Sequence, residues 1–198
     1  MLYSTTMKDV LYFVENIEPR DQIDACIKGG NLMEPKIIKT LCGMEVKIIP
    51  KQENIPDFDT KAIQIKHIDY YDAPYSSYED DEITEEVISK ILEEIPQGLN
   101  IYLYLDPYGE VDQLEVNCDG EWLAIGLSLH GGTKEEKNYY SYNPEYAGVE
   151  EFAHVQSGGQ SPVEKYPALT NKEAGVKAVE YFIRTGKLYP GIDWAEQI

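Results

Sequence analysis

The stretch NIYLYLDPYGEVDQLEVNCDGEWLAIGLSL, residues 100–129, decides the fold. Apolar and polar residues alternate from Asn100 to Leu105 and again from Val111 to Val116, and a third run extends from Trp122 to Leu129. Such alternation is typical of half-buried strands. Asp119-Gly120, between the last two runs, is a preferred two-residue hairpin turn, and an Asp-Pro-Tyr-Gly turn separates the first two runs. The stretch therefore predicts an antiparallel meander of three strands.

A helix is predicted on each side of this meander. Before it, apolar residues recur at helical spacing from Ile83 to Ile95, and Pro96 to Gly98 ends the pattern. After it, Thr170 and Glu173 form a capping box, and Gly186 occupies the position of a left-handed C-cap. The helix that follows Thr170 has its apolar residues on one face, so we expect both helices to pack on the sheet.

The remaining elements complete an α+β prediction. Strands are expected at Met44–Ile49, Ala62–Ile68, Tyr139–Tyr142 and Phe152–Val155, a short helix from Pro19 to Cys26, and a loop that breaks the sheet at Ser157–Pro162. The predicted fold is a mainly antiparallel sheet packed with two principal helices, plus an N-terminal α/β extension. The predicted divisions are an extension at 1–68, an acidic Tyr-rich connector at 69–82 and an α+β domain at 83–198; alternatively, the extension is continuous with that domain.

All of the net charge of −19 lies between His67 and Glu164. This window holds 22 Asp and Glu against 3 Lys and Arg, whereas the segments before and after it are nearly neutral. A concentrated acidic field attracts basic partners and repels nucleic acid. We therefore expect a basic protein partner, and no binding to nucleic acid.

Composition limits the cellular setting. The three cysteines form no CxxC motif, and the N-terminus has no basic segment followed by an apolar run. The most apolar stretch, Leu99 to Leu105, is far shorter than the roughly 18 residues of a membrane-spanning helix. We expect a cytoplasmic protein without a membrane segment.

The motifs of common catalytic and metal sites are missing from the sequence. The three histidines, His67, His130 and His154, have no metal-binding spacing, and there is no Gly-x-Ser-x-Gly motif. The glycine pairs lack the Lys-Ser/Thr of a phosphate-binding loop. We expect no enzyme activity, no metal and no cofactor.

The C-terminal stretch AGVKAVEYFIRTG, residues 174–186, followed by Pro190, Ile192 and Trp194, resembles the closing signature of a bacterial immunity-protein family. This family is associated with deaminase-type toxins of polymorphic and contact-dependent toxin systems. The resemblance extends over residues 80–198. The signature positions, to which we assign structural roles, are Glu180, Phe182, Thr185, Gly186, Pro190 and Trp194.

The resemblance implies a non-enzymatic protein that binds and neutralises a cognate toxin domain of the nucleic-acid deaminase or nuclease type. The acidic window is consistent with this role, because toxins that act on nucleic acid have basic clefts. We expect the contacts on the connector and on a later acidic loop. The candidates are Asp72, Tyr75, Tyr78, Asp80, Asp81, Glu145, Glu150 and Glu151.

Two other classes stay open. An acidic nucleic-acid mimic or adaptor that binds a basic housekeeping protein would have the same charge. A hydrolase whose site is hidden in the sequence would be indicated by a buried carboxylate–histidine pair in a deep pocket.

Overall fold

Residues 99–129 form three consecutive strands of one antiparallel sheet, as predicted: β5 (Leu99–Tyr104), β6 (Gln113–Cys118) and β7 (Leu123–Leu129). The computed structural model describes residues 36–40, 43–71 and 74–198. Strand β6 begins at Gln113 rather than at Val111 because the preceding turn extends to Asp112. The φ of Asp112 is 51°, in the left-handed region, which is incompatible with a strand.

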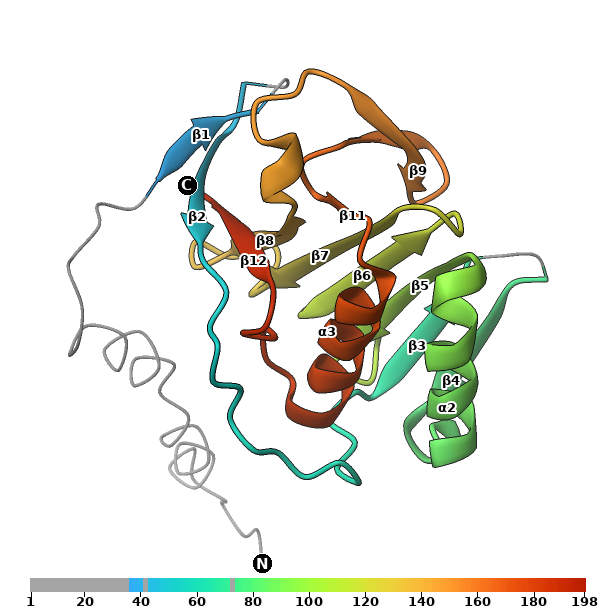
Figure 1. Ribbon diagram of the computed structural model, residues 1–198. Helices are drawn as coiled ribbons and strands as arrows, with labels where there is room; N and C mark the ends of the chain where they lie inside the picture. The colour runs from blue at the N-terminus through green and yellow to red at the C-terminus, as the bar shows by residue number, and fades with distance from the viewer. Residues whose placement is uncertain (1–35, 41–42, 72–73) are drawn as a thin grey trace, which may run out of the picture. The chain divides into compact units, whose positions relative to one another are not determined.

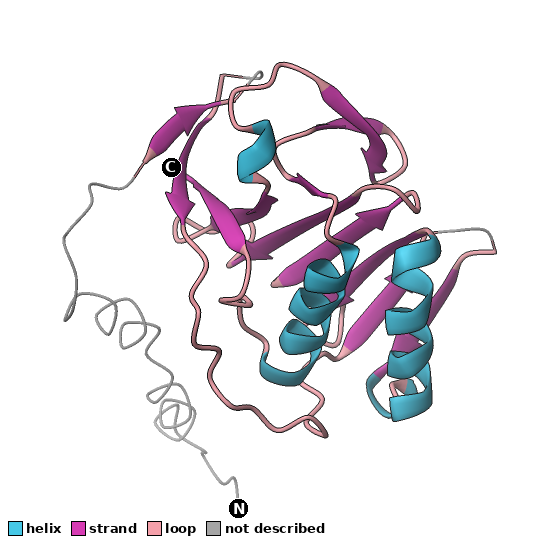
Figure 2. Cartoon of the chain, in the orientation of Figure 1, coloured by secondary structure: helices cyan, strands magenta, loops and turns pink. Residues whose placement is uncertain are grey.

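The sheet has ten strands within the described residues (Figures 1 and 2), in the order β1-β2-β12-β8-β7-β6-β5-β3-β4, with β11 paired to β7. Every pairing is antiparallel. The other strands are β1 (Ile37–Lys39), β2 (Glu45–Ile49), β3 (His67–Tyr70), β4 (Ser76–Glu79), β8 (Lys137–Tyr142), β11 (Ala168–Leu169) and β12 (Asp193–Gln197). Together with the two α-helices of the described residues, this sheet gives the α+β fold that the sequence predicts.

Both principal helices lie on the same face of this sheet (Figure 1). Helix α2 (Glu85–Glu94) is capped by Thr84, whose hydroxyl accepts from the Val87 N–H, and continues into a 3₁₀ turn, η3 (Ile95–Gln97). Helix α3 (Lys172–Thr185) ends at Gly186, which has a φ of 67°. The predicted capping box at Thr170 is wrong, because the side chain of Asn171 accepts from the Ala174 N–H.

The connector predicted at 69–82 is part of the sheet. Asp69 and Tyr70 belong to β3, which pairs with β4 inside the predicted loop, and a 3₁₀ turn, η2 (Asp80–Glu82), follows. The strand predicted at Ala62–Ile68 is also misplaced, because the Gln64 N–H donates to the Ile183 carbonyl of α3 at 2.8 Å instead of to a strand.

Strands on both sides of the predicted boundary at residue 68 share this sheet. Strand β2 pairs with β12, and β3 pairs with β5. Residues 35–198 form one compact unit. The described strands that precede residue 68 therefore belong to the same sheet as those that follow it. The helix predicted at Pro19–Cys26 lies outside the described residues.

The helix-facing side of the sheet contains the main hydrophobic core. Its fully buried members come from the sheet and both helices and include Ile68, Leu103, Leu114, Ile88 and Phe182. The Arg184 side chain, which is 5% exposed, links the helices through paired hydrogen bonds of 2.6 and 2.7 Å to the Glu85 carboxylate of α2.

The opposite side of the sheet is covered over only part of its width by the described residues. Segment 144–167 packs there and forms two smaller cores, one with Trp122 and Ala124 and one with Val46 and Ala195. The segment contains a two-stranded sheet, β9 (Phe152–Ser157) with β10 (Ser161–Glu164). The predicted loop at Ser157–Pro162 is therefore a hairpin turn with strand residues at both ends, and it does not break the main sheet.

Gly175 allows α3 to approach β7 closely. A Cβ at this position would lie 2.1 Å from Leu123 Cδ2 and 3.1 Å from Leu123 Cγ, and Leu123 is fully buried. Although alanine favours a helix over glycine, we expect Gly175→Ala to lower the free energy of unfolding by about 1–3 kcal/mol through overpacking.

Urea denaturation followed by circular dichroism measures this effect. Gly126→Ala in β7 is the control, because the nearest atom to its Cβ would be 3.8 Å away. We expect the control to leave stability unchanged or to raise it by up to about 1 kcal/mol. A Gly175→Ala variant as stable as the wild type would contradict this description of the helix–sheet contact.

Candidate functional site

Strands β3, β5 and β6 align three functional side chains in one row on the face opposite the helices. Asp69 is directly opposite Tyr102, and Tyr102 is directly opposite Glu115. The neighbouring residues Ile68, Leu103 and Leu114 point to the core, so this row must point the other way. A tyrosine ring is therefore flanked by a carboxylate on each side.

Aromatic rings continue from this row in both directions. The ring centroids of Tyr75 and Tyr71 are 6.0 Å apart, and those of Tyr71 and Tyr102 are 4.9 Å apart. Tyr102 stacks on Tyr104 at 6.2 Å, and Tyr104 meets the His67 ring edge to face at 5.5 Å. We call these five residues the aromatic strip. Its outer members, Tyr71 and Tyr75, are 51% and 61% exposed.

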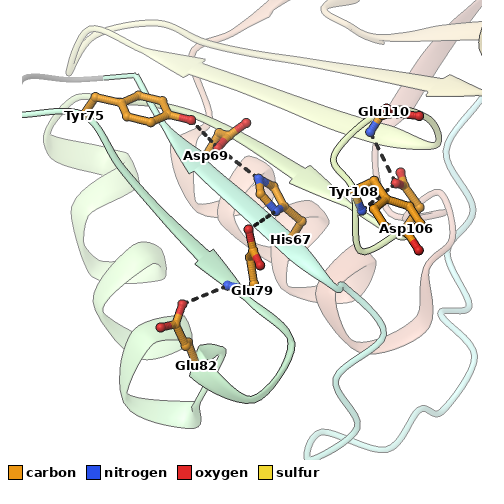
Figure 3. A network of polar contacts seen from close by, with 8 residues as sticks. All are labelled: His67, Asp69, Tyr75, Glu79, Glu82, Asp106, Tyr108 and Glu110. Carbon is orange, nitrogen blue, oxygen red and sulfur yellow. Dashed lines mark hydrogen bonds and ion pairs between the residues drawn. The ribbon is translucent and has the colours of Figure 1, made fainter.

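Asp69 holds two members of the strip in place (Figure 3). Its Oδ1 accepts a hydrogen bond from the Tyr75 hydroxyl at 2.6 Å and lies 3.0 Å from His67 Nε2. The hydrogen bond to Asp69 raises the pKa of Tyr75 to about 12. The carboxylate of Glu79, on β4, lies 3.9 Å from the other His67 nitrogen, Nδ1.

The loop between β5 and β6 packs on His67. The Asp106 carboxylate accepts hydrogen bonds from the N–H groups of Tyr108, Glu110 and Val111, and Figure 3 shows the first two. Partial burial raises the pKa of Asp106, but these hydrogen bonds outweigh it, so the pKa lies below its usual value. The loop brings Gly109 so close that a Cβ there would lie 3.0 Å from the His67 ring. The Tyr108 side chain beside it is 80% exposed.

Glu115 joins the sheet to the β9–β10 turn. Its Oε1 accepts from the Ser157 hydroxyl at 2.6 Å, from the Gly158 N–H at 3.1 Å and from the Asn117 amide at 2.7 Å. Burial, together with the charge of Glu115 and a hydrogen bond to it, raises the pKa of Tyr102. A shallow pocket of about 290 Å³ lies next to Glu115, between the sheet and the hairpin, and is also lined by Tyr140, Glu164 and Tyr166.

The contacts predicted from the sequence fall into two separate regions. Tyr75 and the exposed Asp80 and Asp81 follow one another along the β4 edge. Tyr78 is on the same strand but is half-buried and packs against the core, so only part of it is accessible. Asp72 lies outside the described residues.

The other predicted contacts belong to the segment that covers the far half of the sheet. Glu145, in the 3₁₀ turn η4 (Pro144–Tyr146), and Glu150 are exposed. The Glu151 carboxylate is bonded to Lys165, whose ammonium group also lies over the ring of Trp122 at 5.7 Å. These residues therefore do not join the aromatic strip.

Sequence reasoning missed the inner part of the site. Asp69 was assigned to a loop, and Tyr102 and Tyr104 were treated as ordinary strand residues. Both tyrosines occupy the polar phase of the alternation in β5, on the face opposite the core. That position was the available signal, although Tyr104 is only 5% exposed and Tyr102 is half-buried.

The residues of the C-terminal signature are buried in the fold or bonded to neighbouring backbone groups. Phe182 and Trp194 are 1% and 3% exposed, and the Trp194 indole donates to the Tyr189 carbonyl. The Thr185 hydroxyl donates to the Tyr181 carbonyl, and Gly186 caps α3. The Pro190 carbonyl accepts from Gln52, and Glu180 is half-buried on α3.

The structure contains a carboxylate–histidine pair, His67 and Asp69, of the kind that the hydrolase alternative requires. The His67 side chain is 11% exposed, its nitrogens face Asp69 and Glu79, and the pocket beside Glu115 is lined by other residues. Among the described residues, no group of three His, Cys, Asp or Glu side chains is arranged to hold a metal ion. Nor does any helix in this part of the chain have the length and apolar character needed to span a membrane.

No family model, curated protein or solved structure matches the chain significantly.

Replacing Asp69 tests the geometry of the strip. In Asp69→Asn the hydrogen bond to Tyr75 loses its charged acceptor, so we expect the pKa of Tyr75 to fall from about 12 towards the ordinary value near 10. Titration of ¹³Cζ-labelled tyrosines by NMR measures this change, with Tyr75→Phe to assign the resonance. Tyr108, which has no described side-chain bond, is the internal reference. An unchanged Tyr75 titration would contradict the contact.

Proposed function

We propose that this protein is an immunity protein that binds a cognate bacterial toxin domain and blocks its basic, nucleic-acid-binding cleft. The partner is a deaminase or nuclease domain, and inhibition is stoichiometric. Two features of the sequence support the proposal. The C-terminal signature resembles that of the immunity-protein family, and the charge distribution favours a basic protein partner.

The observation that carries the proposal is the run of uncompensated acids at the sheet edge. Glu79 to Glu82 are four consecutive exposed acidic residues next to the aromatic strip. Among the described residues, no Lys or Arg forms an ion pair with any of them. Such a surface accelerates association with a basic protein and disfavours phosphate.

Aromatic residues lie beside the acids. Their presence favours binding of a protein, because small counterions attracted by the charge alone would not need aromatic contacts. Interfaces between proteins are enriched in tyrosine, and buried aromatic anchors supply much of the affinity. In this division of roles, the acidic edge sets the association rate and the tyrosines set the dissociation rate.

Binding to the toxin encoded beside this gene tests the proposal. We expect the full chain to capture that toxin and to protect cells that express both. Association should slow by on the order of tenfold between about 0.05 and 0.5 M salt, because the Debye length shortens. Absence of binding and of protection, or capture of several housekeeping proteins in place of the toxin, would contradict the proposal.

Charge reversal on the acidic edge gives a sharper measurement. We expect Asp80→Lys/Asp81→Lys to lower the association rate about 3–10-fold and to change the dissociation rate much less. Glu173→Lys on α3 is a control on the helix-covered side, where the side chain is 79% exposed. Surface plasmon resonance with the toxin should give a rate within about twofold of wild type for this control. Equal effects at both positions would contradict a role for the acidic edge.

A further inference from the structure

We propose that the aromatic strip is the docking surface for arginine side chains of the basic partner. The partner's identity as a toxin rests on the proposed function, whereas the preference for arginine follows from the geometry of the strip. The inference thus assigns a surface and a recognition chemistry to the binding activity.

The exposed end of the strip provides a seat for a planar cation. Asp69, Tyr102 and Glu115 are opposite one another on three adjacent strands, and the half-buried Tyr102 ring contacts Tyr71 and Tyr104. A guanidinium therefore stacks on the exposed rings of Tyr71 and Tyr75, where the Asp69 carboxylate lies next to the Tyr75 hydroxyl. Arginine has this flat shape and five donors in one plane, whereas lysine presents a compact, strongly hydrated charge.

Contacts within the protein already orient the side chains of the strip. Hydrogen bonds to Asp69 fix Tyr75 and His67, ring contacts connect Tyr71 to Tyr102, and Glu115 is held by the β9–β10 turn. Since these side chains are already ordered, binding costs little additional conformational entropy. The exposed rings of Tyr71 and Tyr75 are the part of the strip that a partner's cation reaches.

The negative charge of the sheet face opposite the helices favours binding of a cation over binding of a nucleic-acid base. Bases also stack on tyrosine, but they bring phosphates that need basic side chains nearby. None of the outward-facing positions on β4, β3, β5 and β6 that strand pairing defines is Lys or Arg. These positions are Ser77, Glu79, His67, Asp69, Asn100, Tyr102, Tyr104, Gln113, Glu115 and Asn117.

Hexa-arginine and hexa-lysine peptides test the preference directly on the full chain. We expect hexa-arginine to bind at least about fivefold more tightly by isothermal titration calorimetry, as cation–π stacking adds to equal charge. It should also shift the ¹³C-tyrosine NMR signals of Tyr71, Tyr75 and Tyr102. In Tyr71→Ala/Tyr75→Ala the preference should vanish, and in Tyr71→Phe/Tyr75→Phe it should remain, because the rings remain.

Phe152→Ala on β9 is the matched control, because its ring is 48% exposed but lies outside the strip. This variant should bind both peptides as the wild type does. Equal affinities for the two peptides, or an unchanged preference in the double alanine variant, would overturn the inference while toxin capture could still succeed. A single-stranded oligonucleotide that shifts the same tyrosine signals would also overturn it. Conversely, a clear arginine preference without toxin capture would support the surface and refute the proposed function.

Discussion

The register of β3, β5 and β6 is the constraint on which both the core and the candidate site depend. Because side chains alternate along a strand, one register sends Ile68, Leu103 and Leu114 into the core and the row Asp69, Tyr102, Glu115 to the other face. A slip by one residue would bury two carboxylates and expose three aliphatic side chains. Formation of the core therefore fixes the geometry of the binding face, without a separate set of interactions to select it.

The C-terminal segment connects parts of the structure both in the sheet and on its helix-covered side. Strand β12 lies between β2 and β8, so the end of the chain bridges the N-terminal strands and the meander. The buried Arg184 then joins α3 to α2 through Glu85, whose pKa is lowered mainly by its hydrogen bonds to the guanidinium. These contacts account for the signature residues near the C-terminus as scaffold. The proposed docking surface is formed by other elements.

Much of the fold could be predicted from local sequence patterns. Where a prediction was wrong, there is a physical reason. The meander and both helices were predictable because periodicity is encoded locally, and Gly186 marks the left-handed end of α3, although the capping box predicted at its start was wrong. Strand β4 was not, because Tyr78 is the one side chain in Ser76–Glu79 that packs against the core, so alternation leaves little trace. Its pairing depends on the hydrogen bonds of β3. The order of β12 between β2 and β8 is likewise a long-range property that no local pattern contains.

Acidic charge in the sequence favours a basic partner but does not locate a site, because charge is informative only where it is uncompensated and next to a surface of defined geometry. Helix α2 has four acids, as the β4 edge has, but two of them are paired, Glu85 with Arg184 and Glu94 with Lys90. The Glu151 carboxylate is similarly neutralised by Lys165. Asp69 and Glu115, in contrast, have no Lys or Arg ion pair among the described residues and flank an ordered ring. A carboxylate whose hydrogen bonds come from uncharged donors keeps its negative charge. Asp69 accepts such a bond from the Tyr75 hydroxyl, and Glu115 accepts from the Ser157 hydroxyl and the Gly158 N–H.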